Sequence, residues 1–147
     1  MSFRPQRRLP AALIGAGLLC LAPLAQAADT DIARNKALVQ GFWNDVFIAR
    51  KADAAAKYMK PDYIEHDPHV RGGLKGFQDF IREEYGHPPP SLKEQLLNIV
   101  AEGDLVVTYT QFSFTDQQGK PVTGTNFHMY RIKDGMIAEH WDDAPES

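Results

Sequence analysis

The sequence has very little cysteine: Cys20 is the only one among 147 residues. A single thiol excludes an intrachain disulfide framework and a structural zinc site built from thiolates. Clusters of basic residues are also missing after Arg8, and acidic residues outnumber basic ones, so we expect no nucleic-acid partner. The sequence has no serine-triad motif and no phosphate-cradling loop. The glycines at 72, 73 and 76 precede a helix, but the strand and loop of a nucleotide site are missing around them.

The apolar run from Leu9 to Leu24 differs in composition from the rest of the chain. Arginines at positions 4, 7 and 8 precede it, and Ala25-Gln26-Ala27 follows with the small-x-small pattern of a signal-peptidase site. These features predict a signal peptide over residues 1–27 and a periplasmic or secreted protein, with the export route left open. The run is short and interrupted by proline, so we expect no stable membrane anchor after cleavage, although a retained anchor is the alternative.

Removal of residues 1–27 would leave a single domain over residues 28–147. That segment has 13 basic and 19 acidic residues, a net charge of −6 in place of the −3 of the whole chain. It has no cysteine, which excludes cysteine catalysis. Its length suffices for one hydrophobic core and not for two.

Helical patterns come first in this segment, and strand patterns follow. Apolar residues recur at helical spacing over Asp29–Arg50, and shorter helices are expected at Ala52–Met59 and Leu74–Tyr85. Gly41 inside the first helix costs about 1 kcal/mol relative to alanine, so a close packing contact is expected there.

From Leu92 onward, turn residues separate runs that are rich in β-branched and aromatic side chains. These runs predict four antiparallel strands, at Leu92–Ala101, Leu105–Thr115, Pro121–Lys133 and Met136–Asp142. Helices followed by strands indicate an α+β fold in which the helices pack on one face of the sheet.

The last two strands carry the polar residues of greatest interest, and the turn between them sets which side chains share a face. A three-residue turn with Gly135 in the left-handed conformation would pair Ile132 with Met136. His128 would then lie opposite His140, and Asn126 opposite Asp142. A two-residue Asp-Gly turn would shift the pairing by one residue and separate His128 from Asp142.

The order of these parts resembles SnoaL-like proteins of the NTF2-like superfamily. The segments that carry the resemblance are Tyr63-Ile64-Glu65-His66-Asp67-Pro68, Phe77-Gln78-Asp79-Phe80, the strand from Phe127, the Asp134-Gly135 turn and Glu139-His140-Trp141-Asp142. The resemblance implies a cone-shaped barrel around an apolar pocket, in a protein that forms homodimers. It also implies an intramolecular aldol condensation that uses no cofactor and no metal. The aspartate of the family's acid/base pair maps onto Asp142, and the histidine fourteen residues earlier maps onto His128.

On this basis we expect Asp142 to be the general acid/base and His128 to hydrogen-bond a developing enolate. The expected substrate-binding residues are Asn126, His66, His140 and Tyr63. Four of them also have a structural interpretation: Asp142 as a solvated strand end, His128 as a core histidine bonded to His140 or to a backbone carbonyl, Asn126 as a residue that holds Asp142 in place, and His66 as part of a turn. A metal site is an alternative, because possible ligands are present at His66, Asp67, His69, His128 and His140. Pro68 excludes a regular helix between His66 and His69, and we expect no metal.

The sequence therefore predicts a secreted, cofactor-independent acid/base enzyme, of the cyclase or isomerase type, for a small apolar carbonyl compound. The alternative is a periplasmic module that binds such a ligand without turnover. A third interpretation is a structural dimer, in which Trp141 and the outer face of the sheet carry the function.

Overall fold

The computed structural model describes residues 22–142, with side chains from residue 31 onward. The predicted signal peptide lies mostly outside the described residues, and its role stays a prediction. The elements are α1 (Ala22–Phe42), the π-helical η1 (Trp43–Ile48), the 3₁₀ helix η2 (Ala52–Lys57), β1 (Met59–Glu65), α2 (Gly73–Glu84), β2 (Lys93–Glu102), β3 (Leu105–Thr115), β4 (Pro121–Lys133) and β5 (Met136–Asp142). No helix among these residues is both long and apolar enough to cross a membrane.

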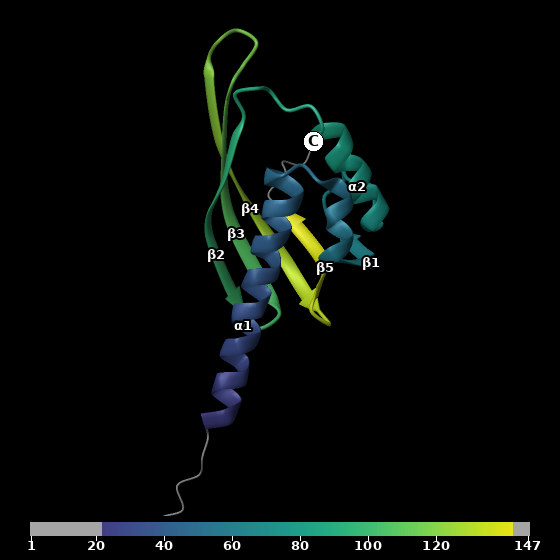
Figure 1. The fold of residues 1–147 in the computed structure, drawn as a ribbon, viewed down its shortest axis with the longest axis vertical. Coiled ribbons are helices and arrows are strands. Elements are labelled where there is room, and N and C mark those ends of the chain that lie inside the picture. Colours follow the sequence, from purple (N-terminus) through teal and green to yellow (C-terminus); the bar gives the residue numbers. More distant parts are fainter. Residues whose placement is uncertain (1–21, 143–147) are drawn as a thin grey trace, which may run out of the picture.

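The five strands form one curved, unclosed sheet in the order β1-β5-β4-β3-β2. Strands β2 to β5 form the antiparallel meander predicted from the sequence, and β1 adds a parallel edge strand beside β5. Figure 1 shows α1 lying across one face of this sheet, with α2 close to β1. The α+β prediction is confirmed, and the face toward the helices is called the inner face below.

The first helix is held against the rest of the fold at Gly41, as its position inside a helix predicts. A Cβ atom on Gly41 would lie 3.0 Å from Cε1 of Tyr58. The same tyrosine donates a hydrogen bond to Oδ2 of Asp45 at 2.8 Å. A close approach of one ring therefore explains a residue that the helix alone would disfavour.

Aromatic rings fill the space between the helices and the inner face. Phe42 is 1% exposed and lies at the centre of this group. Its ring packs against four others, which are those of Phe47, Tyr58, Phe77 and Tyr130. The core therefore joins α1, α2 and β4 into one body.

The β4–β5 turn corrects the register predicted from the sequence. Asp134 and Gly135 both have positive φ, at 55° and 74°, and Lys133 pairs with Met136 across a two-residue turn. The predicted pairing of Ile132 with Met136 is therefore wrong, because Ile132 pairs with Ile137.

A bulge next to this turn restores the arrangement of faces. Ile132 pairs with Ile137 and Arg131 with Glu139, which leaves Ala138 as the extra residue. Beyond the bulge His128 lies opposite Asp142, and Tyr130 lies opposite His140. The predicted pairs were wrong by two residues, and a shift of two keeps every side chain on its expected face.

Candidate active site

The inner face of β4 carries a row of buried residues. His128 is 8% exposed, Tyr130 1% and Ile132 7%, while the residues between them are less buried. The ring of Trp43, from η1, lies 5.8 Å from the ring of His128, and that of Phe47 lies 6.4 Å away. His128 is therefore enclosed by aromatic side chains on the helix side of the sheet.

A line of hydrogen bonds crosses three strands at this position. Nδ1 of His128 lies 3.1 Å from Nε2 of His140, and Nδ1 of His140 lies 2.9 Å from Oε1 of Glu65. The hydroxyl of Tyr63 donates to the other oxygen of the same carboxylate. Glu65 also accepts the backbone N–H groups of His66 and Asp67, at 3.0 and 3.2 Å.

The protonation of these groups follows from burial and hydrogen bonding. Burial, reinforced by the neighbouring His140, lowers the pKa of His128 to about 3, so its imidazole is neutral at pH 7. Burial alone would raise the pKa of Glu65, but the bonds from His140 and Tyr63 outweigh it, and the net pKa is lowered. Burial also raises the pKa of Tyr63. A carboxylate, two imidazoles and a neutral phenol are thus held together below the helices.

Asp142 ends β5 directly opposite His128. One ligand-type atom from each of His128, His140 and Asp142 lies within 4.8 Å of the other two, so the three side chains form one group. Burial raises the pKa of the nearby Tyr85 to about 12, and the charges of Glu94 and Asp142 add to this effect. Tyr85 is therefore a neutral hydroxyl near the carboxylate end of the group.

Two histidines and a carboxylate are also a ligand set that zinc or iron(II) accepts. The geometry favours a hydrogen bond between the imidazoles. The angle between the planes of the two rings is 19°, and Nδ1 of His128 and Nε2 of His140 are at hydrogen-bond distance. A shared metal would require both lone pairs to point at a third position.

The remaining predicted residues fall in two places. Tyr63 is 3% exposed and joins the group through Glu65, and the half-buried Asn126 continues the inner row of β4 opposite Thr110. His66 does not join it. Its ring stacks on Trp141 at 4.4 Å, with the planes within 6°, and Nε2 lies 3.2 Å from Glu139. His66 directly follows Glu65, and its backbone N–H still bonds to the carbonyl of His140. Strand alternation therefore leaves its side chain on the outer face.

Sequence reasoning missed two members of the site. Glu65 was quoted only as part of a motif, although its position two residues after Tyr63 in a strand places both on one face. Trp43 was not among the expected site residues. It is 4% exposed, but its Nε1–H has no hydrogen-bond partner among the described residues. A buried donor without an acceptor beside His128 suits a ligand oxygen.

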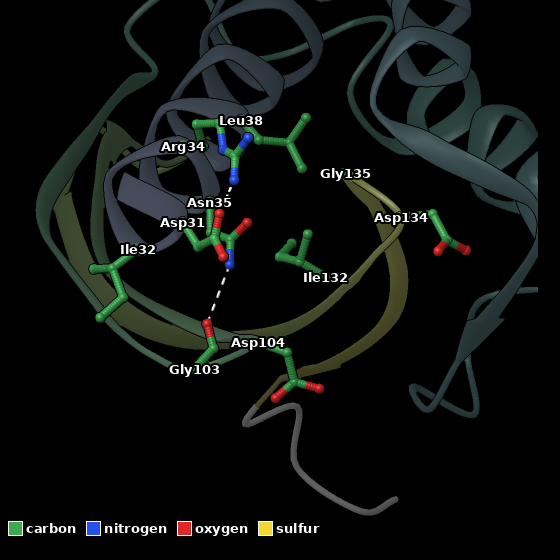
Figure 2. A pocket seen from close by; sticks show the side chains of 10 residues that line it. All are labelled: Asp31, Ile32, Arg34, Asn35, Leu38, Gly103, Asp104, Ile132, Asp134 and Gly135. Carbon is green, nitrogen blue, oxygen red and sulfur yellow. Dashed lines mark hydrogen bonds and ion pairs between the residues drawn. The ribbon is translucent and has the colours of Figure 1, made fainter. Parts of the chain in front are cut away.

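A hollow of about 960 Å³ lies elsewhere, between residues 31–38 of α1, the β2–β3 turn and the β4–β5 turn. Figure 2 shows Asn35 of α1 reaching Gly103 across it, with a hydrogen bond of 3.1 Å. Ile132 lines the hollow, four residues from His128 along β4, which is about 13 Å in a strand. The hollow is thus distinct from the histidine group.

A comparison with family models identifies the domain. The model of the SnoaL-like polyketide cyclase matches residues 37–144, which include every member of the group just described. The chain belongs to the SnoaL-like polyketide cyclase family. Its NTF2-like fold is shared with many solved structures, whereas no curated protein matches it.

Three solved structures show the range of proteins that share this fold. TsrD from Streptomyces laurentii is 24% identical, with a TM-score of 0.65 over 76% of this chain and 87% of TsrD. A Kribbella flavida protein with the provisional name ketosteroid isomerase is 17% identical, with a TM-score of 0.63 over 80% and 82%. An epoxide hydrolase of Mycobacterium tuberculosis, similar to the LEH type, is 14% identical, with a TM-score of 0.59 over 76% and 83%. At these identities the likeness shows the fold alone.

Proposed function

We propose that this SnoaL-like protein is a cofactor-independent acid/base enzyme, of the aldol-cyclase or isomerase type, for a small apolar carbonyl compound. One observation carries the proposal: Asp142 lies opposite His128 on the inner face, and His128 lies beside the rings of Trp43 and Phe47. A base and a proton donor on one side of an apolar space are what enolisation requires.

Asp142 is the base in this proposal. Its carboxylate removes a proton from a carbon next to the substrate carbonyl, and the electron pair of that C–H bond moves toward the carbonyl oxygen. An enolate forms, which then attacks a second carbonyl in a cyclase or takes the proton back at another carbon in an isomerase. Both outcomes need the same first step.

The negative oxygen of the enolate needs hydrogen-bond donors. His128 is one, and it can also pass a proton to this oxygen. The buried Nε1–H of Trp43 is a second donor without a partner among the described residues. Asn126 is a third candidate on the same strand face, two residues before His128. Preorganised donors of this kind stabilise developing charge strongly in a site with little water.

The surroundings and the family support this class of substrate. Aromatic side chains enclose His128, so its surroundings favour an apolar molecule over a polar one. The structural relatives carry the names of a ketosteroid isomerase and an epoxide hydrolase, and the family model is that of a cyclase. These names do not favour the alternative of a binding module without turnover. The signal-peptide pattern supports action in the periplasm. His140 and Tyr63 would hold the site in place through their hydrogen bonds to His128 and Glu65.

The test is a carbon-acid exchange assay in deuterium oxide with a panel of small apolar ketones, followed by NMR, with EDTA present throughout. The wild type should wash deuterium into the carbon next to the carbonyl. Asp142→Asn should slow this exchange by about 10²–10⁴-fold, the usual contribution of a general base. Asp62→Asn, an exposed aspartate of β1, is the matched control and should exchange at the wild-type rate. Equal rates in Asp142→Asn and wild type would refute the proposal.

A further inference from the structure

Glu65, His140 and His128 form a continuous series of hydrogen bonds, and the roles of base and donor proposed above do not require it. Its three members come from β1, β5 and β4, and they hydrogen-bond end to end. All are buried: the side chain of Glu65 is 1% exposed and that of His140 8%. A structural role would need only one such bond, since a backbone carbonyl can hold an imidazole equally well.

The donors and acceptors in this chain are linked. An ionised carboxylate can only accept, so Nδ1 of His140 must carry a proton. If His140 is neutral, its Nε2 accepts, and Nδ1 of His128 must donate. If His140 is an imidazolium, its Nε2 donates, and Nδ1 of His128 must accept. The tautomer of His128 is therefore set by the charge of His140.

We propose that Glu65, His140 and His128 form a proton relay that delivers a proton to the substrate oxygen while His128 itself never carries the positive charge. This inference rests on the proposed function and identifies the source of the proton that His128 donates. Glu65 and His140 are positioning residues in this scheme, because they act through His128.

The transfer balances as follows. In the loaded state His140 is an imidazolium beside the Glu65 carboxylate, and His128 is neutral with its proton on Nε2. The Nε2–H bond of His128 breaks as an O–H bond forms on the enolate. The Nε2–H bond of His140 breaks in turn, and its proton bonds to Nδ1 of His128. The array ends with both imidazoles neutral, and the enolate has become an enol. The proton taken from carbon stays on Asp142, and reversal reloads the array.

The environment explains why the charge rests on His140. That ring lies next to the carboxylate, whereas His128 lies among aromatic rings, and burial lowers the pKa of His128 to about 3. A charged His128 would be a poor intermediate, and the relay avoids it. The other titratable groups that face the array are Tyr63, Tyr85, Tyr130 and Asp142. Burial raises the pKa of each of the three tyrosines, so they stay neutral while the array titrates.

Nitrogen-15 NMR of the histidine side chains in the whole protein tests the relay without any substrate. Between about pH 9 and pH 5, His128 should exchange its proton from Nδ1 to Nε2 and never show two protonated nitrogens. Over the same transition His140 should gain its second proton. A His128 that keeps one tautomer throughout, or that takes up a second proton in this transition, would overturn the relay.

Glu65→Gln supplies the second measurement. Loss of the carboxylate should lower the midpoint of proton uptake by the array by about 1–3 pH units, the usual effect of one opposite charge at contact distance. Glu139→Gln, on the outer face of β5, is the matched control and should leave the midpoint unchanged. An unchanged midpoint in a folded Glu65→Gln protein would also overturn the relay. Circular dichroism checks folding, and the wild-type titration needs no variant.

The two proposals can fail separately. The NMR titration can show the relay in a protein that exchanges no ketone, which would refute the proposed function alone. Conversely, exchange that depends on Asp142 but shows no change of tautomer in His128 would refute the relay alone.

Discussion

His128, in the middle of β4, lies directly opposite Asp142 at the end of β5, and two irregularities put them there. The two-residue turn at Asp134 and Gly135 shifts the pairing by one residue, and the bulge at Ala138 shifts it by one more. Either one alone would turn His140 and Asp142 toward the outer face. The geometry of the candidate site thus depends on a turn and a bulge that act together.

The neutral state of buried His128 predicts a pH dependence of stability. Burial lowers its folded-state pKa to about 3 from an ordinary value of 6.5, so the unfolded chain binds this proton more readily than the folded one. The contribution is fully present above pH 6.5 and is lost as the pH falls toward 3. The free energy of unfolding should fall by up to about 1.4 kcal/mol per pH unit in this range. Urea denaturation at a series of pH values measures it.

Two variants separate His128 from the other titrating groups. His128→Gln should have a shallower acid limb, because one proton-binding group is removed. His69→Gln, an exposed histidine in the β1–α2 loop, should retain the wild-type slope. Parallel acid limbs in wild type and His128→Gln would show that burial of His128 does not govern stability.

The contact between Gly41 and Tyr58 predicts that Gly41→Ala destabilises the wild type but stabilises a protein that lacks the Tyr58 ring. Alanine favours a helix by about 1 kcal/mol over glycine, but its Cβ would lie 3.0 Å from Cε1 and 3.2 Å from the hydroxyl of Tyr58. Gly41→Ala should destabilise the wild type by about 1 kcal/mol, because the ring must move away from Asp45. In a Tyr58→Ala background the same change should stabilise by about 1 kcal/mol. Denaturation of the four proteins completes the cycle, and additive effects would contradict the contact.

Much of the fold could be predicted from the sequence, because its period and turn signals are strong. The strands at Leu105–Thr115, Pro121–Lys133 and Met136–Asp142 have the predicted bounds. The first helix was expected from Asp29 but begins at Ala22, and its last turn widens into a π-helix at Trp43. Strand β1 was not among the four predicted strands, because its parallel pairing with β5 joins residues far apart in the chain.

The sequence predicted which residues meet at the candidate site better than it predicted how they pair. His128, His140 and Asp142 were expected on one face, and the structure brings them together, although not through the predicted pairs. Glu65 shares a face with Tyr63 by strand alternation, but its partner His140 could not be predicted, because the β1–β5 pairing leaves no local signal. His66 was misplaced, because the same alternation puts it on the face opposite Tyr63 and Glu65. The chemical roles of these residues stay predictions.

The buried ion pair between Arg50 and Glu94 predicts that replacing one partner destabilises the fold strongly, whereas replacing both destabilises it little. The side chain of Glu94 is 8% exposed, and burial raises its pKa against the effect of Arg50. Arg50→Met should lower the free energy of unfolding by about 3–5 kcal/mol, because it leaves a buried acid without its partner. Adding Glu94→Leu should recover most of this loss.

An exposed pair supplies the control for this measurement by urea denaturation. Arg71 and Glu83 form an ion pair whose side chains are 72% and 62% exposed. Arg71→Met should change stability by less than about 1 kcal/mol. A similar small loss for Arg50→Met would mean that Glu94 finds another partner or becomes hydrated.

The outer face of the sheet predicts the oligomeric state. Val100 and Phe127 are 54% and 53% exposed there, and the Phe127 ring stacks on Tyr109 at 4.7 Å. With Asn98 and Val107 they line a shallow hollow of about 200 Å³, on the face away from the helices. We propose that a second copy of this chain covers the patch, because a self-complementary sheet face can bury the roughly 800 Å² per partner of a stable dimer.

Sedimentation equilibrium tests this proposal. The wild type should sediment as a dimer, and Phe127→Lys or Val100→Lys should raise the dissociation constant by 100-fold or more, because each would bury an unpaired charge at the centre of the interface. Ile48→Lys is the matched control: Ile48 is 46% exposed at the end of η1, away from the sheet, and its change should leave the dimer intact. The exchange activity should persist in the monomeric variants, because every member of the histidine group comes from one chain and faces the opposite side of the sheet. A wild type that sediments as a monomer, or a dimer that both lysine variants retain, would contradict this interface.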